Sequence, residues 1–258
     1  MQKDRWNKVA GCAWVDSQAI IEGTLEGLVA PLLDGLSGTV LDVGCGTGAT
    51  TVAAAQRGSK PTGVDISEPM LAVARERAPE IPFIVADAQT YAFEPDRFDH
   101  VISRFGVMFF DDPVAAFGNL RRAGRHLRLI VWRTAEENPF MTAAEHAARP
   151  LLPDLPERDP HQPGQFAFGD KAKVERLLSE AGWSEIALEP LDVECAMPAA
   201  ALEGYVSRLG PVGMALQDAD ADTRERVIET VLPAFAAFVQ AERVCFNAAC
   251  WIVTARRL

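Results

Sequence analysis

The 258-residue chain is 48% hydrophobic and 24% charged, a composition typical of a globular protein and not of a disordered one. Its length is ample for a buried core and allows one large domain, or one domain with an insertion. The net charge of −11 argues against a nucleic-acid-binding protein, because such proteins usually present a basic face to the phosphates.

Two further features of the sequence bear on where the protein works. It contains no apolar run long enough to cross a bilayer, and residues 1–14 lack the apolar segment of a signal peptide. The five cysteines are scattered and form no C-x-x-C pair, which argues against a disulfide framework and against a zinc site. We therefore expect reduced cysteines, no metal, no membrane span and a cytoplasmic location.

The first predicted elements run from residue 6 to Trp132. Residues 6–36 are predicted to be mostly helical, and strands and helices alternate from Thr39 onward. Short apolar runs are expected to form strands at 39–44, 61–66, 82–87, within 98–110, and at 126–132. Helices are expected over 49–58, 67–79 and 112–122, the last two opening on Ser67 and Asp112 with a proline in the first turn. This alternation indicates βαβ units and a parallel sheet with both faces covered.

The alternation stops after Trp132. Residues 134–169 are rich in proline, with one short helix expected over 138–148, and a capped helix follows over 170–182. The remaining elements are predicted as strands at 184–197 and 243–257, with helices near 199–216 and 222–241 between them. Pro233 should kink the second of these helices. The acidic stretch 217–226 lacks the spacing of a calcium loop and is interpreted as a solvated turn.

The segment 40–51, VLDVGCGTGATT, carries Gly44, Gly46 and Gly48 where a strand passes into a helix. Glycine is needed where a loop turns sharply or where a side chain would collide with a ligand, and backbone N–H groups at a helix start attract ligands. Gly44, Gly46 and Ala49 also satisfy the fingerprint G-x-G-x-x-G/A, so an NAD-dependent oxidoreductase is one alternative. No Gly-Lys-Ser/Thr follows, which argues against a phosphate-binding P-loop.

Acidic residues at the predicted strand ends help to distinguish the ligand. Asp42 stands just ahead of the first glycine of the segment. Asp65 ends the second predicted strand, where a carboxylate can accept hydrogen bonds from both hydroxyls of a ribose. Asp87 ends the third strand, where an acid could accept a hydrogen bond from the amino edge of an adenine.

Four segments resemble, in order and spacing, the cofactor motifs of the class I S-adenosylmethionine-dependent methyltransferases. They are LDVGCGTG, GVDIS with PMLAVARERA, VADAQ and FDHVISRFGVMFF. The chain is most similar to the small-molecule branch that includes the ubiquinone and menaquinone biosynthesis methyltransferases. The resemblance covers residues 39–132 and, more loosely, the rest of the chain.

This resemblance implies a Rossmann-like α/β fold with a seven-stranded, mostly parallel sheet, helices on both faces and one antiparallel strand near the edge. It implies S-adenosyl-L-methionine as the methyl donor and S-adenosyl-L-homocysteine as the product. The Gly44–Gly48 loop would hold the methionine moiety, Asp65 the ribose hydroxyls, and Asp87 with Ala88 the adenine edge. The cofactor-binding residues implied in this way are Asp42, Gly44, Cys45, Gly46, Gly48, Asp65, Ile66, Met70, Asp87, Ala88 and Ser103.

The acceptor is expected to be a small, apolar or aromatic molecule that is methylated on O, N or C. A general base is needed only if the acceptor loses a proton as it attacks. His146, within the helix expected over 138–148, is the candidate base, with an exposed helical histidine as the alternative. Arg104 is a candidate for holding an anionic substrate group or the cofactor carboxylate, with a surface ion pair as the alternative. The candidate substrate-binding residues are Trp14, Arg104, Phe105, Phe140, Phe168 and Tyr205.

The expected organisation has an N-terminal helical lid segment (1–38), a cofactor-binding core (39–133), a lid insertion (134–169) and the rest of the core (170–258). The last part carries a helical insertion at about 198–241. A second alternative function is a regulatory or interaction protein that binds the cofactor without transferring its methyl group. The acceptor and the oligomeric state are not specified by the sequence.

One segment departs from the family pattern. Members usually carry a Pro-Gly-Gly turn before the fifth strand, whereas residues 121–132 here read RRAGRHLRLIVW. Gly124 alone is therefore expected to end the preceding helix.

Overall fold

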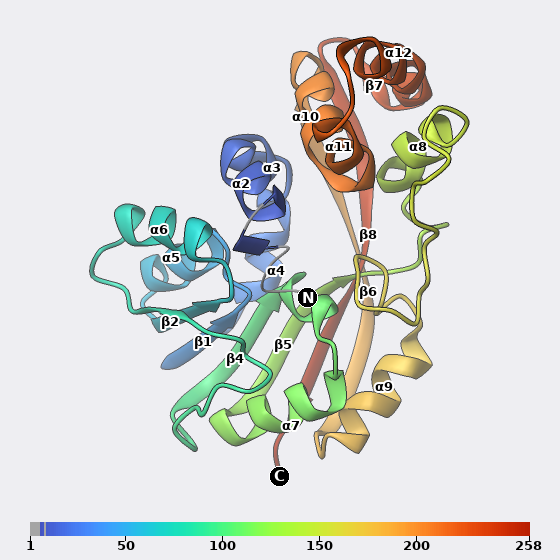
Figure 1. Cartoon of the computed structure of the whole chain (residues 1–258). Helices are drawn as coiled ribbons and strands as arrows, with labels where there is room; N and C mark the ends of the chain where they lie inside the picture. The colour runs from blue at the N-terminus through green and yellow to red at the C-terminus, as the bar shows by residue number, and fades with distance from the viewer. Residues whose placement is uncertain (1–5, 8) are drawn as a thin grey trace.

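The structure is a computed structural model that describes residues 6–7 and 9–258, so residues 1–5 and 8 of the expected N-terminal segment lie outside its description. A central sheet has the strand order β3-β2-β1-β4-β5-β8-β6 (Figure 1). Strands β1 to β5 run parallel, and β8 runs antiparallel to both β5 and β6. This confirms the predicted α/β fold with one antiparallel strand near the edge. The strands are β1 (Thr39–Val43), β2 (Lys60–Asp65), β3 (Phe83–Val85), β4 (Phe98–Arg104), β5 (Gly124–Trp132), β6 (Ser184–Pro198), β7 (Val239–Gln240) and β8 (Arg243–Arg256).

The sheet has eight strands and not the expected seven, because β7 pairs with the start of β8. The sequence pattern predicted helix as far as residue 241. Instead, helix α12 (Ala221–Val231) passes into the 3-10 helix η4 (Leu232–Phe238) at Pro233, which lacks the N–H that would continue an α-helix. The chain then reverses at Ala241, whose φ of 54° is uncommon for a residue with a side chain.

The predicted helices of the core are confirmed as α5 (Ala49–Gln56), α6 (Glu68–Arg77), α7 (Pro113–Ala123) and α9 (Lys171–Glu180). Side chains cap three of them: Ser67 accepts from the Met70 N–H, Asp112 from the Ala115 N–H, and Asp170 from two N–H groups of the first turn of α9. Helices α7 and α9 pack on each other and on β4, β5 and β6, whereas α5 packs on β1 and β2. The expected N-terminal helical stretch is divided into α2 (Val9–Asp16), α3 (Gln18–Thr24), η1 (Glu26–Leu28) and α4 (Val29–Leu33).

Strands β6 and β8 are 15 and 14 residues long and extend beyond the other strands as an antiparallel ribbon (Figure 1). The segment predicted as one helix near 199–216 is divided into η3 (Ala199–Ala201), α10 (Leu202–Arg208) and α11 (Gly210–Gln217). These elements gather with α12 and η4 at the far end of the ribbon, where they meet α8 (Pro139–Ala148). None of the described helices is both long enough and apolar enough to cross a membrane.

Helix α7 passes into strand β5 without a loop, which explains the departure from the family pattern. The helix ends at Ala123 and the strand begins at Gly124, whose backbone is already extended (φ −141°, ψ 167°). A Cβ atom on Gly124 would lie 2.5 Å from Cγ2 of Val101, a fully buried residue of the neighbouring strand β4. Gly124 is therefore required by close packing against β4 and not by an unusual backbone angle.

We predict that Gly124→Ala lowers the free energy of unfolding by about 1–3 kcal/mol, because the added methyl group overpacks Val101. Gly118→Ala is the matched control, since Gly118 lies inside α7 with open space at its Cβ position. The control should raise the free energy of unfolding by up to about 1 kcal/mol through helix propensity. Urea unfolding of both variants tests this, and equal stability of the two would contradict it.

Candidate active site

A cavity of about 850 Å³ opens at the carboxyl ends of β1, β2, β4 and β5. This volume lies in the range of about 300–1,000 Å³ typical of small-molecule sites, and the position is the usual one for ligands on such sheets. Its roof comes from all three expected lid segments: α2 and α3, α8 with the loop over 156–170, and α10 with α11. The sequence therefore brings distant segments to one cavity.

The glycine loop forms the cavity wall between β1 and β2. The N–H groups of Gly44 and Cys45 donate to the Val64 carbonyl at 2.8 and 3.2 Å, which holds the loop against the end of β2. Gly44 has a φ of 67°, and a Cβ on it would lie 2.7 Å from Cα of Gly106, so glycine is required there. Gly48 lies outside the cavity wall, where a Cβ would meet Ala74 at 3.0 Å.

Asp65 is the polar centre of this wall. Its Oδ2 accepts from the Gly46 N–H at 2.8 Å, and its Oδ1 accepts from the Ser67 N–H at 2.9 Å. Burial raises the pKa of Asp65 above its usual value, although these backbone hydrogen bonds oppose the shift. Each oxygen keeps a further lone pair, so the carboxylate can accept more hydrogen bonds at the cavity surface.

The other predicted cofactor residues divide into two groups. Ile66, Met70, Asp87 and Ala88 line the cavity beside Asp65, as do Gly44, Cys45 and Gly46 of the loop. Asp42 and Ser103 do not line it. Asp42 is fully buried below the loop, and the Ser103 hydroxyl donates to the Val43 carbonyl at 2.7 Å. These two residues and Gly48 lie behind the cavity wall, and their assignment as cofactor-binding residues stays a prediction.

Asp42 has an unusual electrostatic environment. Its Oδ2 accepts from the Thr51 hydroxyl at 2.7 Å, whereas its Oδ1 has no hydrogen-bond partner among the described residues. Burial raises the pKa of Asp42 to about 6, against opposing effects of the Thr51 and Thr50 hydroxyls and of the Arg104 charge. Its carboxyl group therefore titrates near neutral pH under the cavity floor.

Strand β4 delivers Arg104 and Phe105 to the cavity. Phe105 has a φ of 69°, a strained conformation for a bulky residue. Its N–H donates to the Ile130 carbonyl at 2.9 Å, and its ring stacks on Trp132 at a centroid distance of 4.5 Å. This turn brings Gly106 against the glycine loop and places an aromatic pair in the cavity wall.

The N-terminal helices are fastened to the glycine loop by Glu22 of α3. Its Oε1 accepts from the Thr47 hydroxyl at 2.7 Å and from Arg77 at 3.0 Å, and its Oε2 accepts from Arg77 at 2.9 Å. Asn7 adds a second connection, donating to the Ile66 carbonyl at 2.8 Å. These polar contacts hold α2 and α3 over the cavity.

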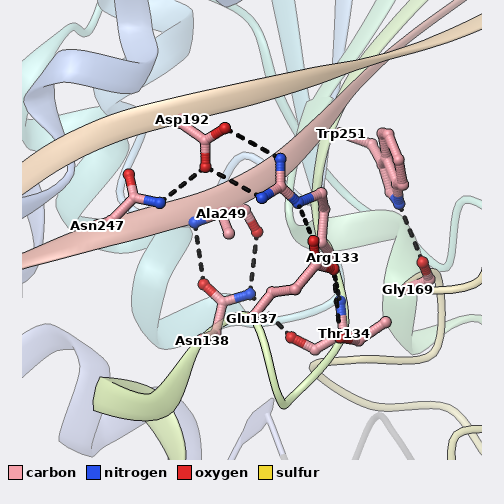
Figure 2. A network of polar contacts seen from close by, with 9 residues as sticks. All are labelled: Arg133, Thr134, Glu137, Asn138, Gly169, Asp192, Asn247, Ala249 and Trp251. Carbon is pink, nitrogen blue, oxygen red and sulfur yellow. Dashed lines mark hydrogen bonds and ion pairs between the residues drawn. The ribbon is translucent and has the colours of Figure 1, made fainter.

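Helix α8 is fastened to the β6–β8 ribbon by a buried amide, as Figure 2 shows. The Asn138 side chain donates to the carbonyls of Thr134 and Ala249 and accepts from the Ala249 N–H, each at 3.0 Å. Beside it, Arg133 donates two hydrogen bonds of 3.1 Å to the carboxylate of Asp192. The start of α8 is thus fixed relative to the sheet.

The candidate acceptor residues are only partly brought together. Trp14, Arg104, Phe105, Phe140 and Tyr205 line the cavity. Phe168 does not line it and instead packs against Phe117, with ring centroids 6.0 Å apart. His146 is also outside the cavity wall, exposed on the outer side of α8, so the structure does not support it as a base.

The titratable residue of α8 that does face the cavity is Glu145, next to His146 in the sequence. Glu145 is buried and forms a two-pronged ion pair with Arg158, whose Nε lies 2.8 Å from Oε2. Sequence reasoning missed this pair, together with Glu22 and Gln89. Helical spacing contained the signal for Glu145, because it follows Phe140 and Met141 by one turn and continues their face.

Comparison with known proteins agrees with this geometry. A methyltransferase-domain family model matches residues 40–127. A demethylmenaquinone methyltransferase of Renibacterium salmoninarum is 27% identical over 164 residues, covering 59% of this chain and 69% of the relative. A magnesium-protoporphyrin O-methyltransferase of Rhodobacter capsulatus is 31% identical over 45% of this chain and 54% of the relative. A solved putative methyltransferase from an antibiotic biosynthesis pathway of Anabaena variabilis matches with a TM-score of 0.60 at 18% identity, covering 88% and 94% of the two chains.

The fold, the glycine loop and the family match together define the class: this chain is an S-adenosylmethionine-dependent methyltransferase of class I. Within that class it is related to the methyltransferases of quinone biosynthesis.

We predict that Asp42→Asn changes how stability depends on pH. The folded-state pKa of Asp42, about 6, lies above the ordinary value of 3.8, so the folded protein binds the extra proton between these values. This residue therefore lowers the wild-type free energy of unfolding as pH rises from about 4 to about 7, by about 3 kcal/mol. The Asp42→Asn variant lacks this titrating group. Its free energy of unfolding minus that of the wild type should therefore rise by about 3 kcal/mol from about pH 4 to about pH 7. Urea unfolding at several pH values would contradict the assignment if the two curves ran parallel.

Proposed function

We propose that the cavity holds S-adenosylmethionine along the glycine loop and a small apolar or aromatic methyl acceptor beneath the lid segments. The observation that carries the proposal is Asp65, a buried carboxylate fixed by two backbone N–H groups at the cavity surface. The close approach of Gly44 to Gly106 supports it, because it brings the glycine loop and the turn after β4 together in the cavity wall. In this proposal the Asp65 carboxylate binds the ribose of the cofactor, and the glycine loop holds its methionine part.

In this proposal the chain binds and orients two small molecules. Asp65 accepts hydrogen bonds from the ribose hydroxyls, Ile66 and Met70 contact the adenine face, and Asp87 lies at the adenine edge with Ala88. When bound, the cofactor supplies a methyl group already activated by its positive sulfur. The residues need only hold the acceptor in line with that group, which supplies much of the acceleration. The lid segments exclude water, which strengthens electrostatic interactions inside the cavity.

Apolar side chains favour an apolar or aromatic acceptor. The aromatic part of the wall comes from the sheet, from the N-terminal helices and from the helical cap at the end of the ribbon. Its aromatic members are Trp6, Trp14, Phe105, Phe109, Phe110, Trp132, Phe140, Phe166, Tyr205, Phe235 and Phe246. The relatives named for demethylmenaquinone and magnesium-protoporphyrin also act on ring compounds.

No histidine lies in the described cavity wall, so we propose that no histidine base is used.

Turnover tests this function directly. The protein is incubated with S-adenosylmethionine and a panel of phenols and hydroquinones, and S-adenosylhomocysteine release is measured against a matched panel of hydrophilic amines. The proposal expects release with aromatic acceptors. Tight cofactor binding with no release on any acceptor would instead support a binding protein without transfer activity. A cytoplasmic location and the lack of a nucleic-acid partner stay predictions from the sequence.

We predict that Asp65→Ala weakens S-adenosylhomocysteine binding by about tenfold to a hundredfold or more. The reason is the loss of charge-assisted hydrogen bonds, each worth about 1.5–3 kcal/mol. Asp218→Ala, which removes an exposed carboxylate at the end of α11, is the matched control and should leave the affinity within twofold. Calorimetric titration measures both, with thermal unfolding to establish that each variant is folded. An unchanged affinity in a folded Asp65→Ala protein would refute the ribose assignment.

A further inference from the structure

Arg104 presents an unbalanced positive charge to the cavity. It is the last residue of β4, paired with Ile130 of β5, and its side chain lines the cavity. Its guanidinium makes one hydrogen bond, from Nη1 to the Leu25 carbonyl at 3.2 Å, and no carboxylate of the described residues lies within ion-pair distance. A guanidinium has five N–H donors, so most of its donors remain available to a ligand.

Neighbouring charges act on Arg104 from a distance without forming a pair. Asp42 and Glu22 are the nearest carboxylates to influence it, together with the Cys195 thiol. Glu22 is already engaged by Thr47 and Arg77, and Asp42 by Thr51. Burial lowers the pKa of Arg104 more than these groups raise it, although an arginine remains protonated at neutral pH.

The other partly buried cation of the wall is neutralised. Arg158 is bound by both oxygens of Glu145 and lies over the ring of Phe166 at 4.7 Å. Arg208 also reaches the cavity wall, but it is exposed at the end of α10. Arg104 is therefore the partly buried cation of the described wall that lacks an acidic partner within ion-pair distance, and a complementary ligand would carry negative charge.

We propose that Arg104 binds an anionic oxygen of the acceptor, a carboxylate or an ionised hydroxyl group attached to an apolar ring. This inference rests on the proposed function and narrows its acceptor to an aromatic or apolar acid. The contact with Leu25 supports the acceptor as the source of the anion. Leu25 lies between α3 and η1, which pack on β6, so this hydrogen bond draws the guanidinium toward β6.

The carboxylate of the cofactor is the competing source of an anion, and binding measurements distinguish the two. The probes are 2-naphthoate and 2-naphthamide, which share one ring system and differ in charge. Each is titrated by calorimetry into wild type, Arg104→Gln and Arg104→Lys, with and without saturating S-adenosylhomocysteine. Arg226→Gln is the control for removing an exposed positive charge, because Arg226 lies on α12 outside the cavity wall. Affinity for S-adenosylhomocysteine is measured for every variant.

The proposal expects wild type to bind 2-naphthoate about tenfold to a hundredfold more tightly than 2-naphthamide, the effect of one charge-assisted contact. Arg104→Gln should abolish that preference, Arg104→Lys should retain part of it, and Arg226→Gln should leave it intact. S-adenosylhomocysteine affinity should stay within about threefold in all variants.

Three results would overturn the proposal: no naphthoate preference in wild type, an undiminished preference in Arg104→Gln, or a tenfold loss of S-adenosylhomocysteine affinity in Arg104→Gln. The last result would assign the anion to the cofactor. Failure of wild type to bind S-adenosylhomocysteine would contradict the proposed function instead. The titrations without this ligand still decide the role of Arg104 in that case.

Discussion

The structure depends on the close approach of three chain segments at the carboxyl end of the sheet. The loop after β1 meets the end of β2 through the Val64 carbonyl and the Asp65 carboxylate. On its other side it meets the turn after β4, where Gly44 and Gly106 nearly touch. Because Gly44 and Gly106 meet backbone to backbone, neither position can hold a side chain. The glycine loop therefore presents its backbone to the cavity, and Asp65 presents a carboxylate held in a fixed position.

The segments predicted as lids add no strand to the parallel core, but apolar side chains such as Ile21, Phe140 and Val206 join them to the hydrophobic core. Polar contacts add to this packing for two of the segments. Glu22 fastens the N-terminal helices to the glycine loop, and Asn138 fastens α8 to the ribbon. A buried amide or carboxylate is stable only when its hydrogen bonds are complete. These contacts help to fix the positions of α3 and α8, and the cavity retains a defined shape although distant segments build it.

Elements with strong local signals could be predicted from the sequence. The strands of the core and the capped helices follow from apolar runs, Ser, Asp and Pro signals and the glycine loop, and Asp65 follows from its place at a strand end. The orientation of single side chains could not be predicted in the same way. Asp42 and Ser103 lie next to cavity residues in the sequence, but strand alternation turns their side chains into the core. On α8, His146 was predicted as the general base because an imidazole can accept a proton. The helical face toward the cavity instead carries Glu145. Strand β7 has only two residues and depends on a tertiary pairing with β8, which no local pattern encodes.

The most direct test of this account is calorimetric titration of the wild-type protein with S-adenosylhomocysteine, S-adenosylmethionine and NAD⁺. S-adenosylmethionine and NAD⁺ both carry a ribose that Asp65 could bind beside the glycine loop. Only a direct comparison of the two ligands therefore distinguishes them. The account predicts one site with micromolar affinity for the first two compounds and no measurable binding of NAD⁺. Binding of NAD⁺ alone would contradict it, and with it the assignment of every residue that lines the loop.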